Sequence, residues 1–123
     1  MTLDANILIA YLAGEQVVVD SLTRWKEEGK LLLLSSVAES EVLSFGGWTD
    51  EERQKTEAWL GENFTSITFD RAIARVAANL RRASRIKFPD AAIAATALST
   101  QTPLVTRNTE DFKKVPGLTL VSL

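Results

Sequence analysis

The chain contains 123 residues, with a formal net charge of −2, no cysteine and no histidine. The absence of these two residue types excludes disulfide frameworks, thiolate chemistry and Ser-His-Asp catalysis, and it disfavours a typical zinc site. The length predicts one domain spanning residues 1–123. The sequence shows neither a signal peptide nor an apolar run of roughly 20 residues. We therefore expect a cytoplasmic protein that does not enter a membrane.

The first quarter of the chain begins with a very short strand at Leu3, which Asp4 closes. Asn6 is the predicted N-cap of a helix, because the apolar side chains of residues 7–12 recur at helical spacing. A second amphipathic helix, rich in valine at its start, ends at Gly29.

The run KLLLLSS (residues 30–36) is continuously apolar and predicts a strand buried on both faces. Ser36 and Glu39 have the spacing of a capping box, so a helix is expected to begin there. The remaining predicted elements are helix 50–62, strand 65–69, helix 70–85, helix 90–99 with Pro89 in its first turn, and strands 103–106 and 118–121. Strands separated by helices predict an α/β fold with a parallel sheet and helices on both faces.

Asp4 closes the first predicted strand, and ligands of open parallel sheets bind at the carboxyl ends of the strands. Taken alone, its carboxylate can also be explained by a share in capping the first helix together with Asn6.

Glu39 and Glu41 lie about 200° apart around a helix axis, so only one of them can face inward. Glu39 is used by the predicted capping box, whereas Glu41 falls on the apolar stripe with Val37, Ala38 and Phe45. A carboxylate on that stripe is costly unless a positive or hydrogen-bonding group meets it. A partly exposed position at the margin of the stripe is the alternative.

Asp90 lies in the first turn of the predicted helix 90–99, on the same side as Ile93, Ala94 and Ala97. This helix is apolar almost all round and is therefore expected to be buried. Interaction with the helix dipole, typically worth 0.3–1 kcal/mol, explains the position of Asp90 along the helix but not its inward face.

The segment RNTEDF follows the strand PLVT and brings Asn108 and Asp111 after Thr106. Asn108 or Thr109 as an N-cap, with acidic residues in the first turn, is a sufficient structural explanation for this segment alone.

Together these segments bring three or four carboxylates to one edge of the sheet, with no histidine and no adjacent lysine to neutralise them. Carboxylates this close raise one another's pKa and repel unless a cation lies between them. Oxygen-only ligands select Mg²⁺ or Mn²⁺, and such a site suits metal-assisted hydrolysis of phosphodiesters.

Four stretches then resemble the PIN-domain family, and more narrowly the VapC-type toxins of toxin–antitoxin pairs. They are LDANILIAYL, SSVAESEVLSF, FPDAAIAATAL and LVTRNTEDF, which occur in family order over nearly the whole chain. The resemblance implies a three-layer α/β/α fold with a central parallel sheet of four to five strands. It also implies an Mg²⁺- or Mn²⁺-dependent endoribonuclease that cleaves RNA, forms a homodimer and is neutralised by a cognate antitoxin.

The family motifs assign individual roles to this sequence. Asp4, Glu41 and Asp90 match the three main acidic metal ligands and catalytic residues. Asp111 is the candidate for the fourth, because Asn108 stands where many members carry Asp. Asn6, Thr106 and Asn108 are expected to be supporting polar residues that orient ligands or water. Ala5 replaces the usual hydroxyl residue after the first Asp.

Cations near the acidic edge are expected to hold the RNA phosphates. The predicted RNA-binding residues are Arg81, Arg82, Arg85, Lys87 and Arg107. A solvated helix face with some ion pairs explains the same residues equally well. The valine-rich second helix is a candidate groove for an antitoxin segment, although core packing accounts for its pattern as well.

Two other functions remain open. In a phospho-receiver-like signalling domain, Asp70 at the end of a strand would be the phosphoacceptor. That class, however, carries an acidic pair after the first strand and a lysine after the strand that corresponds to PLVT. Here Asp4 is alone, and no lysine follows PLVT in that place. A catalytically inactive PIN fold that serves as a protein-binding module is the second alternative.

Overall fold

Five short parallel strands form one sheet in the order β3-β2-β1-β4-β5 in the computed structural model, which describes residues 1–123. The strands are β1 (Thr2–Leu3), β2 (Leu33–Ser35), β3 (Thr65–Ile67), β4 (Leu104–Thr106) and β5 (Leu120–Ser122). This confirms the predicted central parallel sheet. The strands β1, β2 and β4 are buried along their whole length, as continuously apolar runs require.

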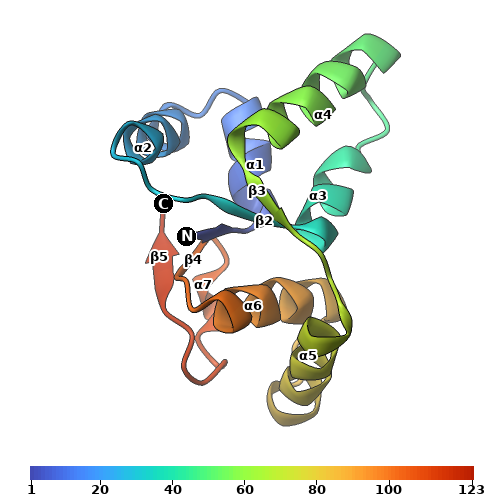
Figure 1. The fold of residues 1–123 in the computed structure, drawn as a ribbon, viewed down its shortest axis with the longest axis vertical. Coiled ribbons are helices and arrows are strands. Elements are labelled where there is room, and N and C mark those ends of the chain that lie inside the picture. The colour runs from blue at the N-terminus through green and yellow to red at the C-terminus, as the bar shows by residue number, and fades with distance from the viewer.

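Seven helices cover the two faces of the sheet. They are α1 (Ala5–Leu12), α2 (Gln16–Glu27), α3 (Ser36–Leu43), α4 (Asp50–Asn63), α5 (Arg71–Ser84), α6 (Phe88–Thr100) and α7 (Thr109–Phe112). Figure 1 shows α1 to α4 on one side of the sheet and α5 to α7 on the other. The predicted three-layer α/β/α arrangement is therefore confirmed. No single helix is long and apolar enough to cross a membrane, and only α1 and α2 taken together, across a bend of 108°, have the required length and composition.

Helix α6 is the central element of the second face. Residues 91–97 are all buried, and five of these seven are alanines. Pro89 lies in the first turn, where its missing N–H is not needed. Small side chains on every side let α6 pack closely against both α5 and the sheet. The prediction that this helix is buried is therefore confirmed, and its packing determines the position of its amino end.

Two predicted helix starts are wrong by one or two residues. Asp4, not Asn6, is the N-cap of α1, and it makes no side-chain capping bond. At α3, Ser35 is the N-cap and its hydroxyl accepts a hydrogen bond from the Val37 N–H, while no capping box forms. The hydroxyl of Ser36 instead accepts a hydrogen bond of 2.9 Å from the Phe69 N–H.

The connections of the sheet reverse direction between β1 and β4. The chain moves from β1 to β2 and β3 on one side, and then crosses back to β4 and β5 on the other. Such a topological switch point leaves a crevice at the carboxyl ends of the two strands, where α/β proteins bind ligands. Asp4 directly follows β1 and Thr106 ends β4, so both residues lie at this point.

Candidate active site at the carboxyl edge of the sheet

Asp4 is buried at the switch point, with only 5% of its surface exposed. The Thr106 hydroxyl donates a hydrogen bond of 2.7 Å to its Oδ2 atom across the crevice. Burial raises the pKa of Asp4, and this effect is opposed by the hydrogen-bond donors of Thr106, Ala5 and Asn6. Because no capping bond uses this carboxylate, capping does not explain why it is buried.

A chain of hydrogen bonds joins Asp4 to the segment after β4. The Thr106 hydroxyl, which donates to Asp4, also accepts a bond of 2.9 Å from the Asn108 N–H. The Asn108 side-chain amide in turn donates a bond of 2.7 Å to Asp111 Oδ2. The Arg107 N–H donates a longer bond of 3.4 Å to the side chain of Asn6. The three residues predicted to be supporting therefore all bond within this segment or across the crevice.

Glu41 does not lie on the buried stripe of α3; of the two alternatives left by the sequence, the structure shows the exposed position at the margin of the stripe. Ala38 and Val42 form the buried face, whereas Glu41 and Phe45 are exposed. The Glu41 carboxylate nevertheless lies close enough to Asp4 and Asp90 to interact with their charges. Partial burial, and then the charges of Asp4 and Asp90, raise its pKa.

Asp90 is half-buried at the amino end of α6, as predicted, and α6 contacts α3 across the edge of the sheet. Burial raises the pKa of Asp90 most, followed by the charges of Asp4 and Asp111. The charges of Lys87 and Lys114 act in the opposite direction. Charge interactions therefore link Asp4, Glu41 and Asp90 with one another, and Asp111 with Asp90.

The predicted RNA-binding cations are all exposed. Arg107 forms a salt bridge with Glu15, whereas Arg81, Arg82, Arg85 and Lys87 form none. Lys114 is a further cation near Asp90 that the sequence did not indicate, because its only local signal is a lysine pair after a short helix.

Asp70, the phosphoacceptor of the receiver alternative, serves as the N-cap of α5. Its carboxylate accepts a hydrogen bond of 2.9 Å from the Ile73 N–H. This bond accounts for an aspartate at that position, because Asp is among the preferred N-cap residues.

The side chains at this edge have the chemical groups that bind a divalent cation. Each of the four acids offers carboxylate oxygens, and none of them forms a salt bridge. Mg²⁺ prefers oxygen ligands, and in proteins it is usually held by one or two carboxylates together with waters. No three acidic side chains lie close enough together in this structure to hold a metal ion.

An α/β domain with acidic side chains at its topological switch point belongs to the class of α/β proteins that bind ligands at the carboxyl edge of the sheet. Within that class the chain belongs to the PIN-domain family, whose model matches residues 1–118. This confirms the family resemblance found in the four sequence stretches.

Three solved structures are similar to this one over almost its whole length. A toxin–antitoxin complex from Klebsiella pneumoniae has 32% sequence identity and a TM-score of 0.82, covering 98% of this chain and 94% of that chain. VapBC2 from Rickettsia felis, bound to a promoter DNA fragment, has 22% identity, a TM-score of 0.85 and coverages of 99% and 97%. VapBC-1 from nontypeable Haemophilus influenzae has 21% identity, a TM-score of 0.82 and coverages of 98% and 96%. No curated protein matches the chain in sequence.

The burial of Asp4 leads to a prediction about stability and pH. Without divalent cations, the Asp4→Asn variant is expected to be more stable than the wild type near pH 7, and the difference should vanish near pH 4. A carboxyl group whose pKa is raised by folding destabilises the folded state once it is ionised. The lost stability is regained as the pH falls through the raised pKa towards the ordinary value of 3.8. Thermal unfolding of both proteins in EDTA measures this difference, and an offset that stays constant with pH would contradict the prediction.

Proposed function

We propose that this chain is a divalent-metal-dependent endoribonuclease and the toxin of a toxin–antitoxin pair. The observation that carries the proposal is a set of carboxylates at the carboxyl edge of the sheet, from the residue after β1 and from α3, α6 and α7. None of them forms a salt bridge, and their charges raise the pKa of Glu41 and of Asp90. Such a set is costly for the folded protein unless a metal ion occupies it, and a costly, electrostatically coupled group in a crevice is typical of functional sites.

In this proposal Asp4, Glu41 and Asp90 are the metal ligands and Asp111 is the fourth acidic residue. Thr106 fixes the orientation of the Asp4 carboxylate, and Asn108 does the same for Asp111. When bound, Mg²⁺ or Mn²⁺ would polarise the phosphodiester and lower the pKa of a bound water. The protein's own contribution is to hold these carboxylates in a partly buried crevice, where their charges act on the ion with little screening.

An apolar groove supports the antitoxin part of the proposal. The groove has a volume of about 500 Å³ and lies between α1 and the segment that runs from α3 to Trp48. Ile9, Leu12 and Phe45 expose large apolar surfaces along it, and Glu41 is its only charged lining residue. An amphipathic segment of a partner fits such a groove, and its occupation would cover Glu41. The groove is therefore formed by α1 and α3, and not by the valine-rich second helix named from the sequence.

The neighbours named above come from toxin–antitoxin systems, which supports an antitoxin partner for this chain. The homodimer implied by the family resemblance and the cytoplasmic location expected from the sequence stay predictions. The apolar groove is also compatible with the alternative of an inactive binding module. The acidic side chains at the switch point favour the nuclease over that alternative, because binding a partner in the groove does not require them.

The purified protein is expected to cleave single-stranded RNA in the presence of Mg²⁺ or Mn²⁺ and to stop when EDTA is added. Gel analysis of an end-labelled RNA measures this activity, and re-addition of the cation in excess should restore it. Cleavage at an unchanged rate in EDTA would contradict the metal requirement. If no cleavage occurs with either cation across several RNAs, the inactive binding module becomes the better description.

A further inference from the structure

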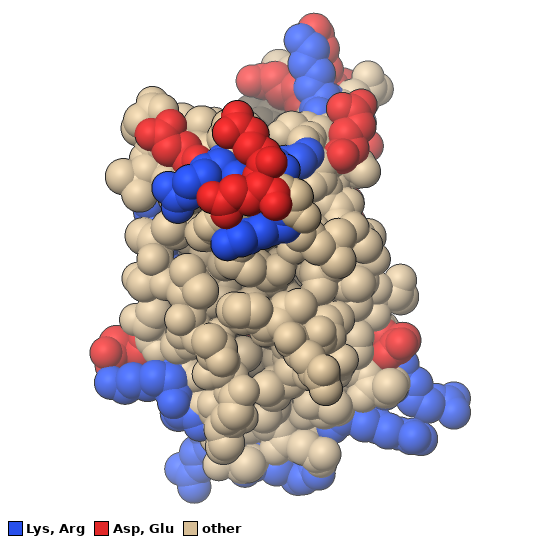
Figure 2. All heavy atoms as spheres, turned by 60° about the vertical axis from the view of Figure 1, so that its left-hand side comes forward, with Lys and Arg blue, Asp and Glu red and all other residues tan.

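The basic side chains of this protein are divided into a paired and an unpaired group. The six that form salt bridges are Arg24, Lys30, Arg53, Lys55, Arg107 and Lys113. The unpaired group is concentrated in residues 71–87, a stretch with six cations and no acidic residue. Figure 2 shows mainly basic side chains at the lower end of the molecule, where α5 lies in Figure 1. A solvated helix that merely balanced its charges would carry acids among these cations.

Lys114 joins this unpaired group from a different part of the chain. A cleft of about 90 Å³ at the amino end of α6 is lined by Arg85, Ile86, Lys87, Asp90, Asp111 and Lys114. Its three cations come from the loop between α5 and α6 and from the turn after α7. None of them forms a salt bridge with the two carboxylates in the same cleft.

The backbone on both sides of Lys114 is fixed. Phe112 and Val115 are buried on either side of it, and the Ser84 hydroxyl donates a hydrogen bond of 3.3 Å to the Lys114 carbonyl. The turn after α7 is thereby tied to the carboxyl end of α5. Since a water molecule occupies about 30 Å³ in the liquid, the cleft has room for a group as large as about three waters, which is enough for a phosphate.

We propose that Arg85, Lys87 and Lys114 form a phosphate subsite that holds the RNA phosphate next to the one that is cut. The subsite rests on the proposed function, because Asp90 and Asp111 border the cleft on the side of the acidic set. The cleft carries three cations against two carboxylates, so its lining has a net positive charge, and the cations release counterions when they bind a phosphate. The subsite positions the strand and reads no base, because phosphate contacts carry no sequence information.

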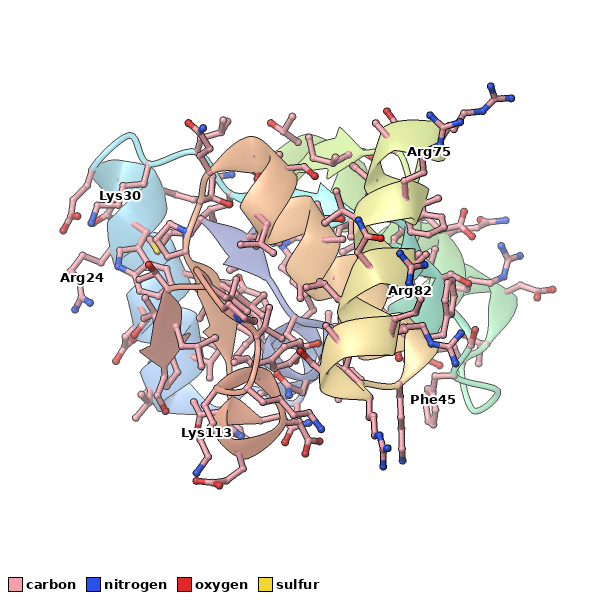
Figure 3. The ribbon with its side chains drawn as sticks, turned by 90° about the horizontal axis from the view of Figure 1, so that it is seen from below. Arg24, Lys30, Phe45, Arg75, Arg82 and Lys113 are labelled. Carbon is pink, nitrogen blue, oxygen red and sulfur yellow. The ribbon has the colours of Figure 1, made fainter.

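The chain provides two matched controls for Lys114. Lys113 is the adjacent lysine, but it is paired with Glu110 and does not line the cleft. Arg75 is unpaired like Lys114, but Figure 3 shows it at the end of α5 away from the edge along which Phe45 and Lys113 project.

The test measures binding of a short fluorescein-labelled single-stranded RNA of mixed sequence in EDTA, so that no cleavage occurs. Lys114→Gln is expected to weaken binding several-fold and to lower the slope of log Kd against log salt by about 0.7, the value for one phosphate contact with a single strand. Lys114→Arg keeps the positive charge and should therefore bind RNA with the affinity and the salt slope of the wild type. Lys113→Gln and Arg75→Gln should bind as the wild type does.

Equal binding and an equal salt slope for Lys114→Gln and the wild type would overturn the subsite. Cleavage of RNA by the wild type with Mg²⁺ would in that case leave the proposed function intact. A wild-type protein that neither binds nor cleaves RNA would overturn both proposals.

Discussion

Replacement of Asp4 by asparagine is expected to lower the rate of RNA cleavage by about 100-fold or more while leaving the fold intact. Residues that only orient a metal ligand typically contribute 10- to 100-fold, so loss of a ligand charge should cost at least as much. The substituted side chain keeps an oxygen that can accept the hydrogen bond from Thr106, so the crevice retains its shape. The measurement is the initial cleavage rate with Mg²⁺ in excess.

Asp70→Asn is the matched control for this experiment. It makes the same chemical change at the end of another strand, and asparagine is as good an N-cap as aspartate. We expect this variant to cleave RNA at the wild-type rate. Full activity of Asp4→Asn would refute the site, and loss of activity in Asp70→Asn would show that any change at this edge is harmful.

Substitution of Ile9 by asparagine is expected to weaken inhibition by the antitoxin about 30-fold while leaving RNA cleavage unchanged. Ile9 is 52% exposed and lines the apolar groove. A central apolar contact in a protein interface is worth about 2 kcal/mol, which corresponds to that factor. A polar side chain there must also be desolvated when the partner binds. The measurement is the inhibition constant of the antitoxin against RNA cleavage.

Val17→Asn controls for the general effect of a polar substitution on an exposed apolar residue. Val17 is 63% exposed on α2 and does not line the groove. Inhibition of this variant should match that of the wild type. If both variants or neither escape inhibition, the antitoxin binds elsewhere.

Most of the fold could be predicted from the sequence, because its strands and its buried helix have distinct apolar patterns. Continuous apolar runs mark buried strands, and residues 88–100 carry an apolar pattern too long for a strand. The helix starts depend on tertiary contacts as well as on local pattern. At α3 two adjacent serines compete for the N-cap, and only tertiary contacts decide that Ser35 caps the helix while Ser36 bonds to Phe69. The stretch T-D-E-E has the spacing of a capping box, and Thr49 and Glu52 form one at the start of α4.

The candidate site was predictable only in part. Asp4 and Asp90 were indicated by strand ends and by an acid on an apolar helix, and both occupy the expected edge. The apolar spacing places Phe45 and Glu41 on one stripe of α3, whereas Phe45 is 61% exposed and the buried face consists of Ala38 and Val42. The bond between Asp4 and Thr106 requires β1 and β4 to be neighbours, which local sequence patterns do not specify.

The alanines of α6 have a consequence for the distances within the acidic set. Alanine side chains set the distance between α6 and the sheet, and only glycine has a smaller side chain. The helix that carries Asp90 therefore already lies about as near to β1 as its packing allows. A larger residue at Ala94 or Ala95 would move the carboxylate outward without touching it. Because a displacement of about 1 Å can cost 100-fold in rate, the small size of these alanine side chains is a condition for the reactivity of the crevice.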